Sequence, residues 1–318
     1  DSQPCLVGSE MCIRDSISSE GINIQSGHSI AINANTSAES INISESASLI
    51  VNPRIQLTIN NTLTNNGTLQ LSSDATGTAT LITTGNISGI GTYNAQQYLS
   101  SARNWYLASP VINASAPAGY SYFKYDEPGN NIGYMAPATA YWETVNPGSA
   151  LSALTGYIVL PANNGISTVE FSGNGINNGD QSITLSRTAG KQKEGFHLIG
   201  NPYPSYLNWS AASRTDVEPT IWYRTKNNAG NYVYDTFNGV GTNNNQNGAV
   251  TGFVPPMQSF WVRVSANRSS GSVTFTNAMR SHESGTNRLK TRAATNTDDK
   301  IMRLELTNGC LLYTSRRG

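Results

Sequence analysis

Histidine is the side chain in this sequence with the widest range of acid–base and metal chemistry, and it is scarce. His28, His197 and His282 are the only three, and none has a plausible metal-ligand partner near it in the sequence. A Ser-His-Asp triad is assembled in space, so sequence order does not exclude one, but no Gly-x-Ser-x-Gly motif supports it. We therefore expect no catalytic residue, no metal site and no cofactor.

Paired carboxylates could hydrolyse a glycosidic bond if two of them lay about 5–9 Å apart. The candidates in the aromatic part of the chain are Asp126, Glu127, Glu143, Glu170, Asp216 and Glu218. Each is interpreted as a solvated loop charge. The glycine-rich run 173–180 lacks the lysine and hydroxyl residues of a phosphate loop and the acidic spacing of a calcium loop. The sequence thus predicts a protein that is not an enzyme.

A rigid turn at Asn201–Pro204 offers a different kind of chemistry, the stacking of aromatic rings on a sugar. Proline fixes its own φ and keeps the preceding residue out of the α region. Such a turn would hold Tyr203, Tyr206 and Trp209 in fixed directions, and these three are the candidate ligand-binding residues. The alternative is a structural corner whose rings pack inward, because aromatic residues mainly serve burial.

The five tryptophans divide by their local context. Trp105, Trp222 and Trp261 lie in strand-like runs beside aliphatic residues, and we expect them to be structural. Trp142 and Trp209 lie closer to predicted loops, and we expect these two to be the more exposed pair. Several rings in one coplanar groove would favour glycan binding over a structural role.

The composition limits the partners. Only 13% of residues are charged, and Lys+Arg equals Asp+Glu at 20 each. A neutral chain gives no electrostatic reason to expect nucleic acid, and no apolar run approaches the roughly 18 residues that insertion into a membrane requires. The remaining partners are a surface glycan or other cell-surface components.

Residues 17–97 carry a repeat of apolar-x-apolar triplets. Ile41 follows Ile22 by 19 positions, and Leu49 follows Ile30 by 19. Two short strands per repeat, closed by Ser/Asn/Gly turns, indicate a short parallel β-helix; the alternative is a disordered polar linker. The residues expected to face inward are Ile24, Ile32, Ile43, Val51, Ile59 and Leu71.

Residues 98–279 hold every tryptophan and phenylalanine of the chain. Short strand-like runs separated by Asn-Gly and Pro-Gly turns are typical of an antiparallel β-sandwich or jelly roll. The predicted strands are 105–108, 120–125, 156–160, 167–171, 181–185, 196–199, 220–223, 232–237, 258–264 and 272–276. The fold class is therefore all-β, a short parallel β-helix followed by a sandwich, and only 205–213 could hold a helical turn.

Four segments carry a resemblance to a known group: residues 65–69, 105–111, 200–205 with Trp209, and 254–262. They resemble large cell-surface proteins of the Bacteroidota, which are similar to type IX secretion cargo with a C-terminal sorting domain. The resemblance implies an extracellular or outer-surface location and brings no known active site. We expect the sorting domain to lie outside this fragment.

The two chain ends differ from the rest. Residues 6–16 resemble a translated frame of a transposase-library sequencing adapter, and residues 310–315 resemble the reverse complement of its inner end. We interpret 1–16 and 310–318 as adapter read-through in a metagenomic fragment; the alternative is a native chain with three cysteines, all of them in these ends. The body then has no disulfide framework.

Residues 280–298 are polar and lack a strand pattern, and we interpret them as a linker. Residues 299–309 alternate apolar and charged side chains, which predicts the first strand of a truncated further domain. Together these features predict a non-catalytic secreted or cell-surface protein, structural or adhesive, with a β-helix stalk and a display domain. The alternative is a glycan-binding module of a larger surface protein or enzyme.

Overall fold

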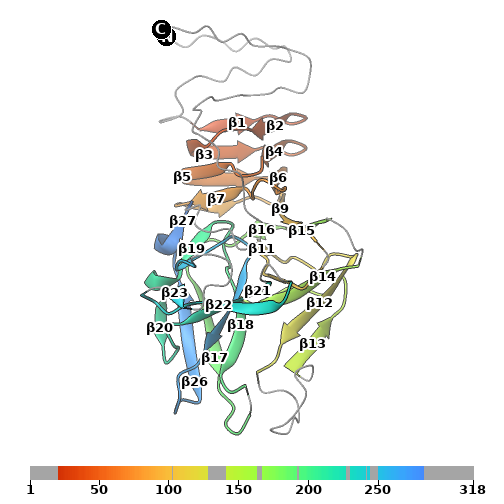
Figure 1. The fold of residues 1–318 in the computed structure, drawn as a ribbon. Helices are drawn as coiled ribbons and strands as arrows, with labels where there is room; N and C mark the ends of the chain where they lie inside the picture. Colours follow the sequence, from red (N-terminus) through yellow and green to blue (C-terminus); the bar gives the residue numbers. More distant parts are fainter. Residues whose placement is uncertain are drawn as a thin grey trace, which may run out of the picture.

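The computed structural model shows an all-β chain in which a stack of parallel rungs stands on a broader body of antiparallel sheets (Figure 1). We call these two parts the solenoid and the head. The structure describes residues 21–101, 103–127, 141–162, 167–191, 193–226, 230–240, 242–243 and 250–282. The predictions for 1–16, for 283–298 of the linker, for 299–309 and for 310–318 lie outside the described residues.

The solenoid consists of two parallel sheets that face each other across each rung. One sheet contains β1 (Ile22–Ile24), β3 (Thr36–Ile43), β5 (Gln56–Asn65) and β7 (Thr80–Thr83), with β8 (Ile87–Ser88) also paired to β5. The other contains β2 (Ser29–Ile32), β4 (Ser48–Val51), β6 (Thr68–Leu71) and β9 (Thr92–Leu99). The parallel β-helix predicted from the triplets is confirmed.

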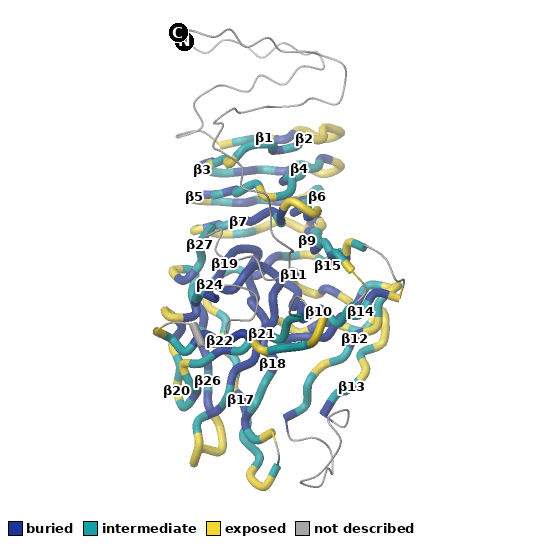
Figure 2. Tube along the Cα trace, viewed as in Figure 1, coloured by how far each residue is buried: buried dark blue, intermediate teal, exposed yellow. Residues whose placement is uncertain are grey.

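The register follows the sequence repeat, since Ile22 lies beside Ile41 and Ile30 beside Leu49. All six residues expected to face inward are buried (Figure 2). Residues two apart on a strand point to the same face, so each triplet directs two aliphatic side chains inward. Apolar burial along the stack is therefore the main force that holds the rungs together.

Close stacking also constrains the turns between rungs. A Cβ atom added to Gly67 would lie 2.2 Å from the main-chain oxygen of Ala47, so only glycine fits there. The adjacent Asn65 is fully buried, and its side chain accepts a hydrogen bond from the Gly67 amide (3.1 Å) and donates one to the Thr92 oxygen (3.0 Å). Neutral amides thus satisfy backbone groups between rungs without placing like charges above one another.

The head is built from small antiparallel sheets. One sheet has the order β10 (Trp105–Leu107), β14 (Tyr157–Pro161), β12 (Tyr120–Tyr125), β13 (Trp142–Val145). The largest has the order β18 (Phe196–Gly200), β25 (Ser259–Arg263), β21 (Ile221–Lys226), β22 (Tyr232–Phe237), β23 (Thr242–Asn243).

Three smaller sheets complete the head. They are β11 (Val111–Ile112) with β16 (Gly175–Ile176); β17 (Gln181–Ser186), β26 (Ser270–Phe275) and β20 (Ser213–Thr215); and β24 (Phe253–Val254), β19 (Tyr206–Asn208) and β27 (Arg280–Ser281). Short 3-10 helices, η2 (Trp209–Ala211) and η3 (Asn277–Met279), lie between strands. The helical turn expected within 205–213 is η2, and the described residues contain no α-helix.

The predicted division of the chain at residues 97 and 98 lies inside a strand. β9 crosses that point as the last parallel strand of the solenoid, and β15 (Ser167–Gly173) then pairs antiparallel along its whole length. One sheet therefore runs from β2 through β9 to β15. A single buried cluster likewise extends from Ile24 in the first rung to Trp105 and Phe171. The solenoid and the head share a core.

Candidate functional site: the solenoid junction and an arginine–tyrosine pocket

The turn at Asn201–Pro204 forms part of the junction between the solenoid and the head. The Asn201 side chain is fully buried and donates to the main-chain oxygens of Ser205 (2.7 Å) and Pro255 (2.9 Å). Its own oxygen accepts from the Tyr203 amide (3.0 Å). On the other side of the turn, the Leu81 amide of the last solenoid rung donates to the Pro204 oxygen (2.8 Å). The rigid turn thus holds the edge of the solenoid.

The three candidate sugar-binding residues lie inside the head. Tyr203 and Trp209 are 0% exposed and Tyr206 is 9% exposed. The expectation that Trp209 is exposed is wrong, because its ring packs on Phe260 (5.5 Å between centroids) and its Nε1 donates to the Pro219 oxygen (2.7 Å). The burial of these rings fits the structural-corner alternative and provides no platform for a sugar.

Arg280 connects three parts of the chain at this junction. Its guanidinium donates to the main-chain oxygens of Leu81 (3.0 Å) and Thr83 (3.3 Å) in the last rung, and to the side-chain oxygen of Asn178 (2.6 Å) in the head. Its central carbon lies 5.1 Å from the centre of the Tyr203 ring. Burial lowers the pKa of Arg280 to about 10, so the group stays charged at neutral pH.

His282 extends the same contact up the outer face of the solenoid. Its two ring nitrogens lie 3.0 Å from the Thr58 hydroxyl of β5 and 2.7 Å from the Thr80 hydroxyl of β7. Its main-chain oxygen accepts from the Gln56 side chain (3.1 Å). Burial, together with the nearby Arg280 charge, lowers the pKa of His282 to about 4. The imidazole is therefore neutral at physiological pH, with one nitrogen donating and the other accepting.

We call residues 280–282 the clasp. The sequence predicted that a linker begins at residue 280, but Arg280 and Ser281 form β27, which pairs with β19 in the head. The described residues of that polar segment, Arg280, Ser281 and His282, are partly buried rather than solvated. Sequence reasoning missed the clasp because nothing in its local pattern shows that the last rung lies beside it.

A second aromatic cluster lies in the head at Tyr125, Tyr141, Trp142 and Trp261. Tyr125 lies 5.3 Å from Trp142 and 4.8 Å from Trp261, with interplanar angles of 73° and 81°. Tyr141 stacks on Tyr125 (5.8 Å between centroids, 11° between planes), and both stacked and edge-to-face pairs are typical of rings packed on one another in a folded interior. Trp142 is half-buried and thus more exposed than Trp105, Trp209 and Trp261, so of the pair expected to be more exposed only Trp209 departs from the prediction.

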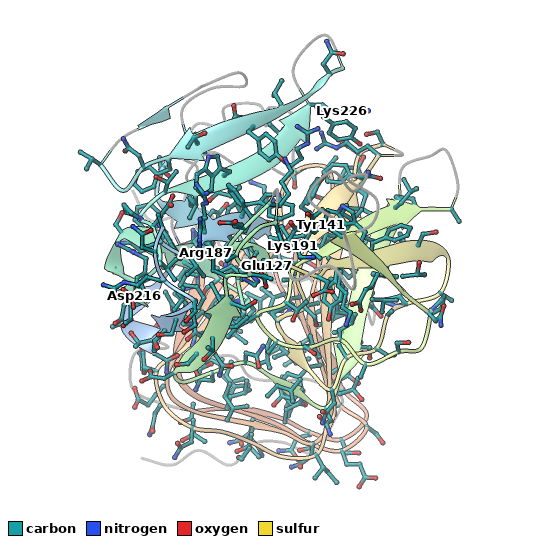
Figure 3. The ribbon with its side chains drawn as sticks, turned by 90° about the horizontal axis from the view of Figure 1, so that it is seen from below. Glu127, Tyr141, Arg187, Lys191, Asp216 and Lys226 are labelled. Atoms are coloured by element: carbon teal, nitrogen blue, oxygen red, sulfur yellow. The ribbon has the colours of Figure 1, made fainter. Side chains whose placement is uncertain are left out.

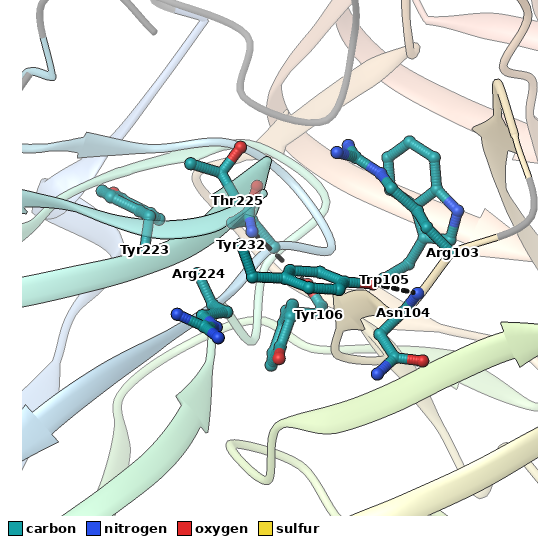
Figure 4. A pocket seen from close by; sticks show the side chains of 9 residues that line it. Arg103, Asn104, Trp105, Tyr106, Tyr223, Arg224, Thr225 and Tyr232 are labelled. Atoms are coloured by element: carbon teal, nitrogen blue, oxygen red, sulfur yellow. Dashed lines mark hydrogen bonds between the residues drawn. The ribbon is translucent and has the colours of Figure 1, made fainter. Parts of the chain in front are cut away.

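One pocket of the head is lined by cationic and aromatic side chains (Figure 4). We call it the arginine–tyrosine pocket, and the residues that define it are Arg103, Trp105, Tyr106, Arg224, Tyr232 and Gln258. Arg103 lies just before β10, Trp105 and Tyr106 lie in β10, and the β21–β22 hairpin supplies Arg224 and Tyr232. Its enclosed space is about 10 Å³, room for one water-sized group.

The hairpin places cations on tyrosine rings. The Arg224 guanidinium lies 4.5 Å from the centre of the Tyr234 ring and 5.2 Å from that of Tyr232, and the Lys226 ammonium lies 4.9 Å from Tyr232. The Tyr232 hydroxyl accepts from the Asn104 amide (3.1 Å), which fixes the hairpin against the neighbouring segment (Figure 4). Arg224, Lys226, Tyr232 and Tyr234 alternate along two paired strands, a period-2 pattern that the sequence analysis did not use.

A family model described as Domain of unknown function (DUF8693) matches residues 17–309. The chain belongs to this family. The search of curated proteins and the search of solved structures both found no match. In this chain, the DUF8693 fold is a short solenoid joined to a head, with the clasp across the junction.

The carboxylates of this DUF8693 chain serve structural contacts where they are described. Glu127 is buried and accepts from the amides of Thr188 (2.9 Å) and Gly195 (2.7 Å), and Arg187 pairs with Glu194 (2.8 Å) close by. Figure 3 shows Glu127 and Arg187 near the middle of the head. Further ion pairs between described residues are Lys124–Glu143, Arg263–Glu218 and Arg268–Asp216, and Glu170 accepts from Gln96.

His197 is likewise held in place, with its Nε2 2.7 Å from the Ser186 oxygen and its pKa lowered by burial. Among the described residues, no three His, Cys, Asp or Glu side chains gather as they would around a metal ion. Within the same residues, no helix has the length and apolar character needed to cross a membrane.

Proposed function

We propose that this chain is a non-catalytic structural module of a secreted or cell-surface protein, in which the solenoid is a short rigid stalk and the head is the displayed part. One observation carries the proposal, the sheet that runs without a break from β2 in the solenoid through β9 to β15 in the head. A shared sheet and core resist bending in a way that a flexible linker does not.

The junction contacts add to this rigidity. The clasp binds the last rung through Arg280 and two rungs through His282, and the Asn201–Pro204 turn binds the edge of β7. Two separate segments of the chain thus fix the same end of the solenoid. A stalk holds the displayed part at a fixed distance and orientation, so a display role requires a stiff junction.

Surface location is the second part of the proposal, and the resemblance of residues 65–69, 105–111, 200–205 and 254–262 to Bacteroidota surface proteins supports it. The test is immunolabelling of intact cells that express the natural gene, with antibodies raised against the folded chain. Labelling of intact cells is the expected result. Labelling that requires cell lysis would contradict a surface role. Hydrolysis of glycosides in a broad panel by the purified chain would contradict a non-catalytic role.

We also propose that residues 1–16 and 310–318 derive from a sequencing adapter. The support for this proposal is that the two ends of the chain match opposite strands of one sequencing reagent. Amplification of the gene from the source sample without transposase adapters should give different codons at both ends. Recovery of the same codons would show that these residues are native.

A further inference from the structure

The edge of the solenoid that faces the head is covered along most of its length. In one sheet, β15 pairs with the edge strand β9. In the other sheet, the Asn201–Pro204 turn and the clasp bind the backbone of Leu81 and Thr83 in β7. Two residues further on, the Gly85 oxygen accepts from the Asn178 side chain (2.9 Å). Peptide groups and side-chain donors of the head thus satisfy these edge positions, as a fold must do where a sheet would otherwise end in unpaired groups.

The strand β8 is the part of this edge that stays open. The Leu63 amide of β5 donates to the Asn86 oxygen (3.0 Å), and Leu63 lies beside Ile87. In a parallel pair, a residue directs both its N–H and its oxygen to one side, and the next residue directs both to the other side. Ile87 therefore turns both groups away from β5. Among the described residues, β8 has no second strand neighbour, and no backbone bond from a turn or loop reaches Ile87.

A groove of about 380 Å³ lies beside β8, between the solenoid and the β11–β16 pair. This volume is within the usual range of ligand-binding clefts. Asn86, Ile87 and Ser88 line it from the solenoid, and Ile112 and Asn174 line it from the head. The side chains of Asn86, Ser88 and Asn174 are exposed and that of Ile112 is 42% exposed, so a ligand can reach them from solvent.

The lining groups suit a peptide better than a sugar or a nucleic acid. None of the described residues that line the groove is charged, and the aromatic one among them, Tyr93, is 1% exposed and offers no open ring for a sugar or base to stack on. The Asn86 and Asn174 amides carry the donor and acceptor types of a peptide group. The exposed Ile112 adds an apolar wall. An uncharged backbone with an aliphatic side chain matches this set of groups.

We propose that this groove binds an extended, uncharged peptide segment of a partner protein, which adds to the edge of the solenoid beside β8. The N–H and the oxygen of Ile87 pair with the backbone of the segment, and an aliphatic side chain of the segment packs on Ile112. In strand addition, main-chain hydrogen bonds give affinity and side-chain contacts give specificity. The inference goes beyond the display role, which stands whether or not the groove is occupied.

The probe is a panel of uncharged octapeptides, blocked at both ends, in which valine, isoleucine or leucine alternates with threonine or serine. Binding of each fluorescently labelled peptide to the full chain is measured by anisotropy, with a titration to obtain Kd. We expect at least one peptide to bind. The same peptide with N-methylated backbone amides should bind at least tenfold more weakly, because it has lost its main-chain donors. Binding of no peptide, or equal binding of the N-methylated form, overturns the proposal.

The decisive variant is Ile87→Pro, which removes the N–H that faces the groove and breaks no hydrogen bond to β5; it should weaken binding at least tenfold. If this variant does not fold, Ile112→Asn decides instead, and it should weaken binding about fivefold through the lost apolar contact. The matched control is Val240→Asn, a change at a 95% exposed apolar residue that does not line the groove, and its binding should equal that of the wild type.

Unchanged binding in the deciding variant, or an equal loss in the control, overturns the proposal. Two further outcomes also overturn it by assigning the groove to another occupant. One is a concentration-dependent dimer that Ile87→Pro disperses, which would identify a second copy of this chain. The other is binding of neutral dextran that the same variant abolishes, which would identify a glycan.

Discussion

Replacing Arg280 with methionine tests whether the clasp holds the solenoid on the head. Methionine keeps much of the volume but removes the donors that reach the Leu81 and Thr83 oxygens. A hydrogen bond that involves a charged group contributes about 1.5–3 kcal/mol, and an acceptor left unsatisfied in a buried site costs about 1–3 kcal/mol. We therefore expect the free energy of unfolding to fall by about 3 kcal/mol.

The assay is thermal melting combined with hydrogen exchange. For a protein of this size, 1 kcal/mol shifts Tm by about 2–4 °C, so Tm should fall by roughly 10 °C. The Leu81 amide, which donates to Pro204 across the junction, should exchange faster, whereas the Ile30 amide in the first rungs should change less. The control is Arg268→Met, which breaks only an exposed ion pair worth about 0–1 kcal/mol. Equal melting of the two variants would refute the clasp.

Two further predictions concern buried groups. The pKa of His282 is lowered to about 4 from 6.5, so its contribution to stability is full above pH 6.5 and is lost as the pH falls towards 4. Between pH 7 and pH 5, the melting temperature of His282→Asn should therefore fall less than that of the wild type. Parallel curves of melting temperature against pH would disprove this. Trp209→Ala should lower the free energy of unfolding, measured with denaturant, by about 3–5 kcal/mol because the Trp209 ring is fully buried. Trp142 is half-buried, so Trp142→Ala should lower it clearly less. Similar losses for the two variants would show that the contrast in burial is wrong.

Strands whose residues alternate over four or more positions were predictable from the sequence. The solenoid triplets gave the correct rungs and inward faces, and the long runs of the head, such as Tyr232–Phe237, are strands in the structure. The two-residue strands β11, β16, β24 and β27 were not predicted, because they are too short to show a period. Tertiary partners alone determine that they are strands.

Pairing was the other property that local pattern could not reveal. Residues 167–171 were correctly predicted as a strand, but their partner is β9 of the solenoid, 74 positions away from Glu170 at Gln96. The Asn201–Pro204 turn was recognised as rigid, yet its role depends on the nearby Leu81 amide. The clasp carried only the signature of a polar linker, since hydrogen bonds to another part of the chain leave no local periodicity.

A rigid junction is the central claim, and electron–electron double resonance tests it most directly. Spin labels at Ser26→Cys in the first turn of the solenoid and Ser269→Cys in the head, both exposed, would report their separation after Cys5, Cys12 and Cys310 are replaced by serine. A pair at Ser121→Cys and Ser269→Cys, both within the head, gives the reference width. The account predicts one narrow distance distribution for the solenoid–head pair, as narrow as the reference; a broad or double-peaked distribution would contradict it.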